Sequence, residues 1–365
     1  MKPKPNTGKR IGINTLFMIP NAVGGTEYHL RSTLSQLEQK DVVNEYIVFC
    51  NEENYDTFEF TNPRWKKVRC QIRASFRPFR ICYEQIVLPF QVLALGCDLL
   101  HSFGYFGPII SPVKHIITIH DVNWRDCPED FGFFERMALR ILIELNIVTC
   151  TGITVVSEFT KERLTLHFPS VKDKVYVTPS GVNEVFLREL EKKHAHPLNG
   201  KQFLLCVSAM YPHKKIPYVL DVWEQILEKN DSLQLVLIGR NGKDEKNVKD
   251  RIKRLPRIQC LEKVSLPKLV SFYQHTLGFV FPSAYEGFGY PVFEALASGL
   301  TVYVGNNHYS LPKGKDALKK LTFDAHRDAG MILEDLKKVG KKRVFESLDN
   351  KKSVSALLTL YKNTI

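Results

Sequence analysis

The sequence contains no apolar run long enough to span a lipid bilayer. Its longest apolar segment, residues 86–100, is interrupted by Pro89, Gln91 and Asp98, whereas a membrane-spanning helix needs about 20 mostly apolar residues. The first ten residues are basic and polar and lack the apolar stretch of a signal peptide. We therefore expect a cytoplasmic protein that meets a membrane, if at all, peripherally on the inner face.

Cysteine pairs typical of metal or redox sites are also missing. The eight cysteines stand singly and form no CxxC pair, which argues against a zinc ribbon or a thioredoxin-type site. Acidic residues are outnumbered by basic ones, 39 to 51, so the formal net charge is +12. Such an excess predicts an anionic partner, which could be a nucleic acid, an acidic membrane face or a phosphorylated substrate.

The chain is too long for one ordinary core, because chains above about 250–300 residues usually split into domains. Apolar strand-like segments alternate with segments of helical spacing in both halves, which predicts parallel sheets covered by helices. We expect an α/β protein of two facing, doubly wound Rossmann-like domains, with ligands in the cleft between them. The predicted ranges are residues 1–180, residues 181–350, and a C-terminal helix at 351–365 that can cross back to the first domain.

The sharpest chemical signal is a glycine-rich loop between a predicted strand and a predicted helix. Gly287 and Gly289 allow backbone amides to approach a ligand, and Pro291 suits the first turn of the helix. Amides exposed at a helix start favour a phosphate. Glu286 and Glu294 flank this loop, and a carboxylate is the usual partner of vicinal sugar hydroxyls. The alternative is that a glutamate near the helix start only compensates the helix dipole.

The segment EGFGYPVFEALASG resembles the EX7E signature of family 4 of the retaining glycosyltransferases, which have the GT-B fold. The resemblance implies that Glu286 contacts the transferred sugar as a catalytic residue, and that Glu294 binds the ribose of the nucleotide. It also implies that the amides of Phe288 and Gly289, together with Tyr290, face the donor sugar and its diphosphate.

Other segments resemble the same family in the expected order along the chain. Gly24 and Gly25 are similar to its N-terminal glycine loop, which approaches the donor phosphates. His120 matches the His-Asp strand end, where the family's catalytic histidine lies by the donor sugar and the acceptor. Residues 157–159 and 179–182 resemble the turns at the family's domain boundary. Taken alone, a Gly-Gly turn and a strand-end histidine are more often structural.

The loop VSAMYPHKK resembles the family's donor-phosphate loop, and Lys214 matches the lysine that neutralises the diphosphate. Many members have an arginine where this chain has Ser208 or Ala209, and Ser208 is a predicted donor-binding position. His213, Lys215 and Arg240 are the candidates for a substitute cation.

Two segments after the EX7E helix depart from the family. Residues 299–302 read Gly-Leu-Thr-Val instead of Gly-x-Pro-Val, and in the loop at 308–313 Lys313 stands in place of an acidic residue. The donor nucleotide and sugar therefore stay open.

A strongly basic stretch lies between residues 64 and 80. Aromatic residues Trp65, Phe76 and Phe79 are interleaved with its cations. This pattern predicts a surface that docks on anionic lipid. A solvated loop is the bland alternative, and nucleic-acid binding ranks lower because no nucleic-acid module accompanies the stretch. The predicted membrane-surface residues are Arg64, Trp65, Lys66, Lys67, Arg69, Arg73, Arg77 and Arg80.

The resemblance implies a hexosyltransferase that moves a sugar from a nucleotide diphosphate sugar to a hydroxyl of a glycan, lipid-linked, in cell-surface polysaccharide or lipopolysaccharide synthesis. It implies no metal or other cofactor. The style of the loop around Lys214 favours GDP-mannose, with UDP- and dTDP-sugars open. The alternative is a catalytically degenerate relative that acts as a binding partner or scaffold. A dinucleotide-dependent oxidoreductase is disfavoured because no GxGxxG follows the first strand.

Overall fold

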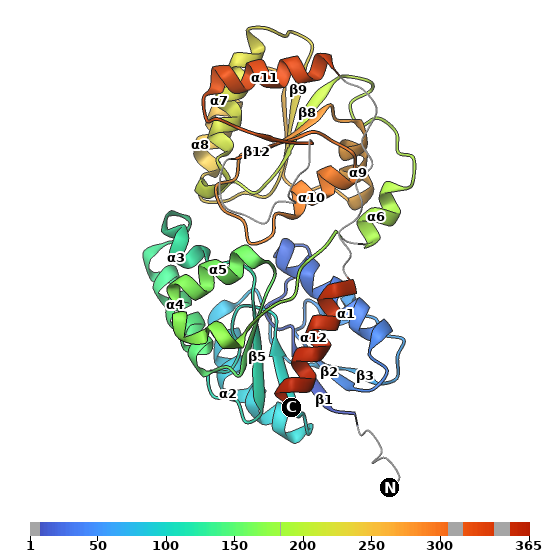
Figure 1. Cartoon of the computed structure of the whole chain (residues 1–365), viewed down its shortest axis with the longest axis vertical. Helices are drawn as coiled ribbons and strands as arrows, with labels where there is room; N and C mark the ends of the chain where they lie inside the picture. The colour runs from blue at the N-terminus through green and yellow to red at the C-terminus, as the bar shows by residue number, and fades with distance from the viewer. Residues whose placement is uncertain (1–7, 183, 306–316, 339–350) are drawn as a thin grey trace. The chain divides into compact units, whose positions relative to one another are not determined.

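A computed structural model describes residues 8–182, 184–305, 317–338 and 351–365 of the chain (Figure 1). It divides into two compact units. Unit 1 comprises the chain up to Val122, then Phe133–Ser180 and the C-terminal helix, and unit 2 comprises Asn123–Gly132 and the chain from Gly181 to that helix.

Unit 1 is built on a parallel sheet of seven strands in the order β3-β2-β1-β4-β5-β6-β7. The order reverses between β1 and β4, which makes this the switch point of a doubly wound sheet. Most strand residues are buried, as expected for a parallel sheet covered on both faces. The strands are β1 (Arg10–Asn14), β2 (Glu45–Cys50), β3 (Trp65–Arg69), β4 (Leu99–Ser102), β5 (Lys114–Ile119), β6 (Gly152–Val155) and β7 (Val175–Val177).

Helices cover both faces of this sheet (Figure 1). Side chains of α1 and α12 pack with β1 and β2 in one core, and those of α2 pack in another. The side chain of Ser157 caps α5 by accepting a hydrogen bond from the amide of Thr160. The helical segments are α1 (Gly25–Lys40), η1 (Tyr55–Thr57), α2 (Arg77–Ala94), α4 (Phe133–Thr149), α5 (Glu158–His167), η3 (Pro169–Lys174) and α12 (Lys351–Thr364).

The C-terminal helix α12 packs in unit 1, beside α1 and the strands β6 and β7. Leu357, Leu360 and Tyr361 are buried in the same core as β1. The hydroxyl of Tyr361 lies 2.6 Å from Nδ1 of the buried His101 on β4. The last helix of the chain thus completes the first sheet's core.

Unit 2 is built on a second parallel sheet in the order β10-β9-β8-β11-β12-β13. Its strands are β8 (Phe203–Val207), β9 (Gln234–Ile238), β10 (Ile258–Leu261), β11 (Gly278–Phe281), β12 (Val302–Val304) and β13 (Leu318–Lys320). Its helical segments are α3 (Asn123–Asp126), η2 (Pro128–Asp130), α6 (Glu184–Leu190), η4 (Pro212–Lys214), α7 (Ile216–Leu227), α8 (Glu245–Ile252), α9 (Leu266–His275), α10 (Tyr290–Ala297) and α11 (Ala325–Lys337).

Two doubly wound α/β units confirm the predicted fold class. Two local expectations differ from the structure. Residues 123–132, assigned from the sequence to the first domain, belong to unit 2, and the predicted membrane stretch at 64–80 forms β3 and the start of α2. Within the described part of the chain, no helix is both long and apolar enough to cross a membrane.

Candidate functional site

The loop that carries the EX7E pattern leads from β11 into α10, and its geometry requires glycine. Gly289 precedes the helix with φ 85° and ψ 47°, a left-handed conformation that is costly for other residues. Pro291 occupies the first turn, as its sequence position predicts, because a proline has no amide hydrogen to leave unpaired there. The ring of Phe288 stacks on that of Phe293, with centroids 4.5 Å apart, and holds the loop against the helix.

Glu294 projects from α10 into a buried polar position. The hydroxyl of Tyr273 on α9 donates a hydrogen bond of 2.9 Å to Glu294 Oε2. Burial raises the pKa of Glu294 to about 7, and the Tyr273 hydrogen bond opposes that shift. The carboxyl therefore changes protonation near neutral pH, which is unusual for a glutamate.

Lys214 and Glu286 form a direct ion pair within unit 2. Lys214 ends η4, and its Nζ lies 2.6 Å from Oε1 of Glu286. Both side chains are mostly buried. The amide of Ala284 donates to the carbonyl of His213 at 2.8 Å and so joins the two loops that carry the pair. A cation and a carboxylate from distant parts of the sequence thus meet where the sequence predicted the donor site.

Ser208 lies at the end of β8, where β8 and β9 approach closely. Its amide donates to Ile238 O at 2.8 Å. A Cβ on Gly239 would lie 1.9 Å from Ser208 O, so only glycine fits beside this strand end. Ser208 itself offers a hydroxyl and no charge. Its side chain donates to the carbonyl of Ala209 at 3.3 Å.

His213 cannot serve as the substitute cation while it keeps its present contacts. Its buried ring contacts the carboxylate of Asp130 in η2 through Nδ1, and its amide donates to Asp130 Oδ1 at 3.4 Å. Lys243 adds a second link by donating to Phe131 O at 3.0 Å. These contacts fasten residues 123–132 into unit 2.

Lys215 and Arg240 are exposed and stay as candidates for the second cation. Lys215 has a left-handed backbone, with φ 54°, at the start of α7.

Sequence reasoning missed two residues of this region, Tyr273 and Asp130. Tyr273 precedes Glu294 by 21 residues, a separation that no local sequence pattern spans. Asp130 lies in a part of the sequence assigned to the other domain. The predicted donor-site loop at 308–313 lies outside the described residues.

In unit 1, His120 directly follows β5 and is buried. Its Nε2 lies 2.7 Å from the carbonyl oxygen of Phe103. Because a carbonyl only accepts hydrogen bonds, Nε2 carries the hydrogen and Nδ1 is left as an acceptor in the neutral ring. Burial lowers the pKa of His120 to about 4, so the ring is neutral at pH 7.

A second buried histidine, His29 of α1, supports His120. The two rings meet edge to face with centroids 5.4 Å apart. Nδ1 of His29 lies 2.7 Å from Oγ of Ser180, the last residue of the unit 1 segment Phe133–Ser180. Burial is the main cause that lowers the pKa of His29 to about 3, and His120 adds to it.

Gly24 and Gly25 form the start of α1 and are exposed. Gly24 has φ 59° and ψ −129° and caps the helix without a side chain, so the first amides of α1 have no capping oxygen from this residue. Glu27 in the first turn accepts from the amide of Asn21 at 2.6 Å and pairs with Arg31 at 2.9 Å. The carboxylate of Glu27 balances part of the positive helix end.

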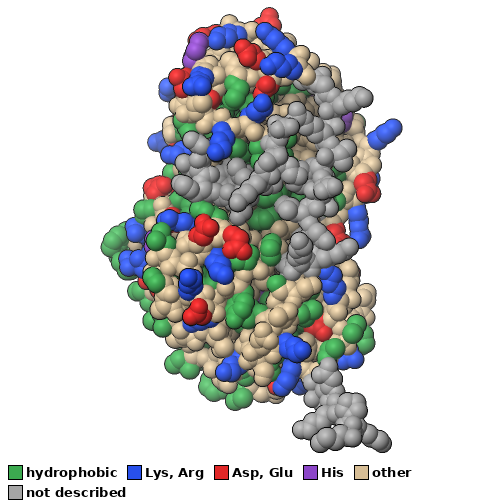
Figure 2. All heavy atoms as spheres, in the orientation of Figure 1, with side chains coloured by type: hydrophobic (Ala, Val, Ile, Leu, Met, Phe, Trp, Pro, Cys, Tyr) green, Lys and Arg blue, Asp and Glu red, His purple; other side chains and the backbone are tan. Residues whose placement is uncertain are grey.

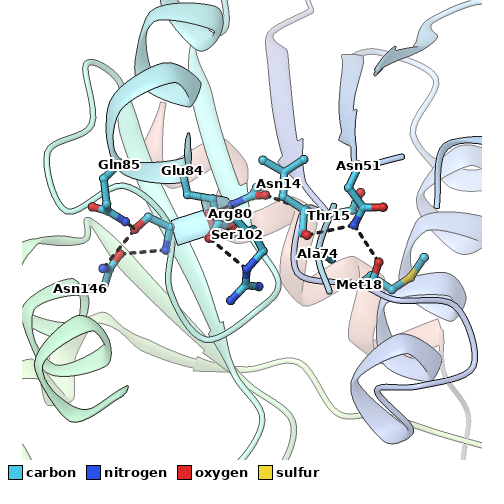
Figure 3. Close-up of polar contacts among 12 residues, drawn as sticks. Asn14, Thr15, Met18, Asn51, Ala74, Arg80, Glu84, Gln85, Ser102 and Asn146 are labelled. Atoms are coloured by element: carbon cyan, nitrogen blue, oxygen red, sulfur yellow. Dashed lines mark hydrogen bonds and ion pairs between the residues drawn. The ribbon is translucent and has the colours of Figure 1, made fainter. Parts of the chain in front are cut away.

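A buried polar cluster occupies the switch point of the unit 1 sheet (Figure 3). Asn14 ends β1 and Ser102 ends β4. The side-chain Nδ2 of Asn14 donates to Ser102 Oγ at 3.2 Å and to Glu84 Oε1 at 3.1 Å. Arg80 lies one helical turn before Glu84, with Nε 3.9 Å from Glu84 Oε2. Burial raises the pKa of the Glu84 carboxyl, and Arg80 opposes the rise.

The predicted membrane-surface stretch is largely engaged within unit 1. Trp65 is buried and stacks on Tyr46, with ring centroids 4.1 Å apart, and Arg80 is buried beside Glu84. The expectation that these two residues belong to an exposed surface is therefore wrong. Lys66 is exposed, while the other cations have partners: Arg64 with Val43 O, Lys67 with Tyr55 O and Phe58 O, Arg69 with Asp56, Arg73 with Glu52, and Arg77 with Glu135.

Among the residues that the structure describes, no group of three or more His, Cys, Asp or Glu side chains is placed to hold a metal ion. The cation of Lys214 and the amides of the glycine loop are the groups at the predicted donor site that suit an anion.

Two family models match the chain in succession. The model described as "Glycosyltransferase Family 4" matches residues 23–186, and the model described as "Glycosyl transferases group 1" matches residues 188–351. Together they span both units. The chain belongs to glycosyltransferase family 4.

Among curated family 4 relatives, the O-antigen chain mannosyltransferase RfbU of Salmonella typhimurium is 26% identical over 229 residues, which cover 61% of this chain and 59% of that protein. The O-antigen chain mannosyltransferase B of Escherichia coli is 25% identical over 209 residues, 55% of each chain. The chain thus spans little more than half the length of these relatives.

The fold of the whole chain also resembles that of solved glycosyltransferase structures. The sucrose-phosphate synthase of Thermosynechococcus elongatus superposes with a TM-score of 0.67 at 17% identity, over 97% of this chain and 95% of that one. A likeness at this identity concerns the fold.

Proposed function

We propose that this family 4 protein is a retaining hexosyltransferase that moves a sugar from a nucleotide diphosphate sugar to a hydroxyl of a lipid-linked glycan. GDP-mannose is the first donor to test, because two relatives are named O-antigen mannosyltransferases and the loop around Lys214 favours it. The acceptor belongs to cell-surface polysaccharide or lipopolysaccharide synthesis, on the cytoplasmic face of a membrane.

The observation that carries the proposal is the pairing of Lys214 with Glu286 at 2.6 Å beside the start of α10. One binding site here supplies a cation for a diphosphate, a carboxylate for sugar hydroxyls and the positive end of the α10 helix dipole. Glu294, on the same helix, supplies a buried carboxyl for a ribose. A nucleotide diphosphate sugar presents all three kinds of group.

In the proposed reaction the bond between the sugar and the diphosphate breaks, and Lys214 stabilises the negative charge that develops on the leaving phosphate. The leaving phosphate accepts the proton of the acceptor hydroxyl, and the new bond forms on the same face of the sugar. Neutral His120 accepts a hydrogen bond from a sugar hydroxyl through Nδ1. We propose that Lys214 and the loop amides meet the diphosphate charge without a metal ion, so chelator treatment should leave the rate unchanged.

The first experiment is a thermal-shift screen of the purified protein with GDP, UDP, dTDP, CDP and ADP. A ligand at about 100 times its dissociation constant adds about 2.7 kcal/mol of stability. One diphosphate should raise Tm in the wild type and lose this effect in Glu294→Ala. The matching nucleotide sugar should then be consumed in the presence of a glycan acceptor.

The competing function is a catalytically degenerate binding protein. It would be supported if a diphosphate binds in the wild type while no nucleotide sugar is hydrolysed or transferred. If no diphosphate binds at millimolar concentration, the donor site itself is degenerate and the transferase proposal is wrong.

A further inference from the structure

The helix α2 carries apolar side chains on its outward face as well as its inward face. Leu88 and Val92 point into the core beneath it. Phe79, Ile86 and Phe90 lie on the other side and are exposed, Phe90 by 71%. A surface helix normally places polar residues outward, because its apolar stripe is used for the core. The described residues of unit 1 therefore leave the outward stripe of α2 uncovered.

The helix α4 repeats this pattern. Ile143, Asn146 and Ile147 are its buried residues. Phe134, Ile141 and Val148 follow one another at helical spacing on the outward face, and Phe134 is 84% exposed. Single exposed apolar residues are ordinary on protein surfaces. Each of these two helices instead carries a row of them along its outward face.

Two sets of contacts hold these helices beside each other and in the same direction. Near their starts, Arg77 Nη1 of α2 donates to Glu135 Oε1 of α4 at 2.7 Å. Further along, Gln85 Nε2 of α2 and Asn146 Nδ2 of α4 both donate to the carbonyl of Gly107, at 2.8 and 3.3 Å (Figure 3). The two stripes thus form one surface, the α2–α4 face, and Figure 2 shows hydrophobic side chains along the lower left edge of the view, where Figure 1 places these helices.

We propose that the α2–α4 face docks unit 1 on an anionic lipid bilayer. Contiguous exposed apolar surface marks a site of association, and side-by-side helices with outward phenylalanine and aliphatic side chains match the interfacial helices of membrane-surface proteins. Arg77, Arg136 and Arg140 lie on the same two helices. Arg77 and Arg140 pair with Glu135 and Glu144 at 2.7 and 3.0 Å, and their side chains are 69% and 40% exposed. Because exposed ion pairs are weak, lipid phosphates can take over these guanidinium groups.

The net charge of +12 fits an anionic leaflet better than a second copy of the same chain, which would bring two equally positive surfaces together. The face also takes in the C-terminal part of the predicted stretch at residues 64–80, because Arg77 and the exposed Phe79 lie on α2. The inference adds a location to the proposed function, which needs access to a lipid-linked acceptor. Its test, however, requires no turnover.

The test is sedimentation of the full chain with vesicles of phosphatidylglycerol and phosphatidylethanolamine, with phosphatidylcholine vesicles as the neutral comparison. Phe90→Asp in α2 and Ile141→Asp in α4 place a charge in the face. Val42→Asp is the matched control, because Val42 is 67% exposed on the turn between α1 and β2. All three positions are exposed, so the variants should fold, which circular dichroism and Tm will check.

We expect the wild type and Val42→Asp to bind anionic vesicles, and each stripe variant to bind at least tenfold more weakly. High salt should weaken binding, because surface charges are screened. Equal binding by all four proteins, or no binding by any, would overturn the proposal. A further contrary result would be a dimer, detected by light scattering, that Phe90→Asp dissociates, together with no binding to vesicles. The α2–α4 face would then be an interface between two copies of the chain.

The fate of the proposed function is read separately. Vesicle binding with no consumption of any nucleotide sugar would leave the docking surface standing and count against the transferase. Sugar transfer to a soluble acceptor by a protein that does not bind vesicles would support the transferase and count against the docking surface.

Discussion

Lys214 and Glu286 neutralise each other in the structure, with Nζ and Oε1 2.6 Å apart. The two groups proposed to bind different ends of the donor, the diphosphate and the sugar, are therefore partners of one another before any donor arrives. Binding must exchange this ion pair for contacts with the donor. The pair keeps each mostly buried charge compensated in the meantime, which avoids the cost of an unpaired buried charge.

Replacing Glu286 by glutamine should separate binding from turnover. Glu286→Gln keeps the shape but releases Lys214 from its ion pair, so the affinity for a nucleoside diphosphate should be equal or higher. Turnover should fall by about 100-fold or more, because a charge-assisted hydrogen bond to the sugar is lost. Calorimetry and initial rates measure the two effects.

Lys214→Ala should show the opposite pattern in the binding experiment. The loss of one charge-assisted contact should lower the affinity for a nucleoside diphosphate by about 10- to 100-fold. Lys215→Ala is the neighbouring control, since its side chain is exposed. Unchanged diphosphate affinity in Lys214→Ala would contradict the proposed role of this lysine.

Nucleotide binding should strengthen as the pH rises through the range in which Glu294 ionises. Burial raises the pKa of Glu294 to about 7, and only the carboxylate accepts hydrogen bonds from both ribose hydroxyls. A group with pKa 7 is about tenfold more ionised at pH 8 than at pH 6. We expect up to about tenfold tighter binding across this interval.

The control is Glu294→Gln, which cannot ionise, so the difference between its pH profile and that of the wild type isolates the carboxyl. Tyr273→Phe removes the hydrogen bond that lowers the pKa of Glu294 and should move the transition to higher pH.

The effect of Glu294 on folding stability has the opposite dependence on pH. A raised carboxyl pKa means that the native protein binds the extra proton, so its stabilising effect is lost as the pH rises from about 4.5 to 7.

The tautomer of His120 can be tested with two amide substitutions. His120→Gln places a donor near the position of Nε2 and can keep the hydrogen bond to Phe103 O, but it removes the acceptor at Nδ1. Turnover should fall by about 100-fold or more while nucleoside diphosphate binding is unchanged. His120→Asn, whose amide lies near the position of Nδ1, should keep more activity. An active His120→Gln enzyme would show that Nδ1 is not used.

The C-terminal helix should stabilise unit 1 through Tyr361. Tyr361→Phe removes the hydroxyl that lies 2.6 Å from Nδ1 of His101 and leaves that buried nitrogen unpaired. The expected loss is about 1–3 kcal/mol of unfolding free energy, measured by urea denaturation. Thr359→Ala, at an exposed position of the same helix, should cost far less. Diphosphate binding should not change, because the contact lies within unit 1.

Local patterns in the sequence were enough to predict the two doubly wound units and several helix ends. Gly289 and Pro291 predict where α10 begins because a left-handed turn and a missing amide hydrogen are properties of single residues. Ser157 predicts the start of α5 for the same kind of reason. The EX7E spacing lies within one loop and the helix that follows it, so it too is visible in the sequence.

What lies beside these residues was decided by the tertiary structure. Lys214 meets Glu286, and Tyr273 meets Glu294, across sequence separations that no local pattern constrains. Asn123–Gly132 belongs to unit 2 because Asp130 and the carbonyl of Phe131 find His213 and Lys243 there.

The basic stretch shows the same limit. Sequence alone determined that residues 64–80 are basic and that residues 86–100 are apolar, but not which side chains reach the surface. The alternation of β3 buries Trp65 and exposes Lys66, and the rotation of α2 turns Arg80 inward and Phe90 outward. Burial depends on which face of each element meets the sheet, and that is a property of the packed fold.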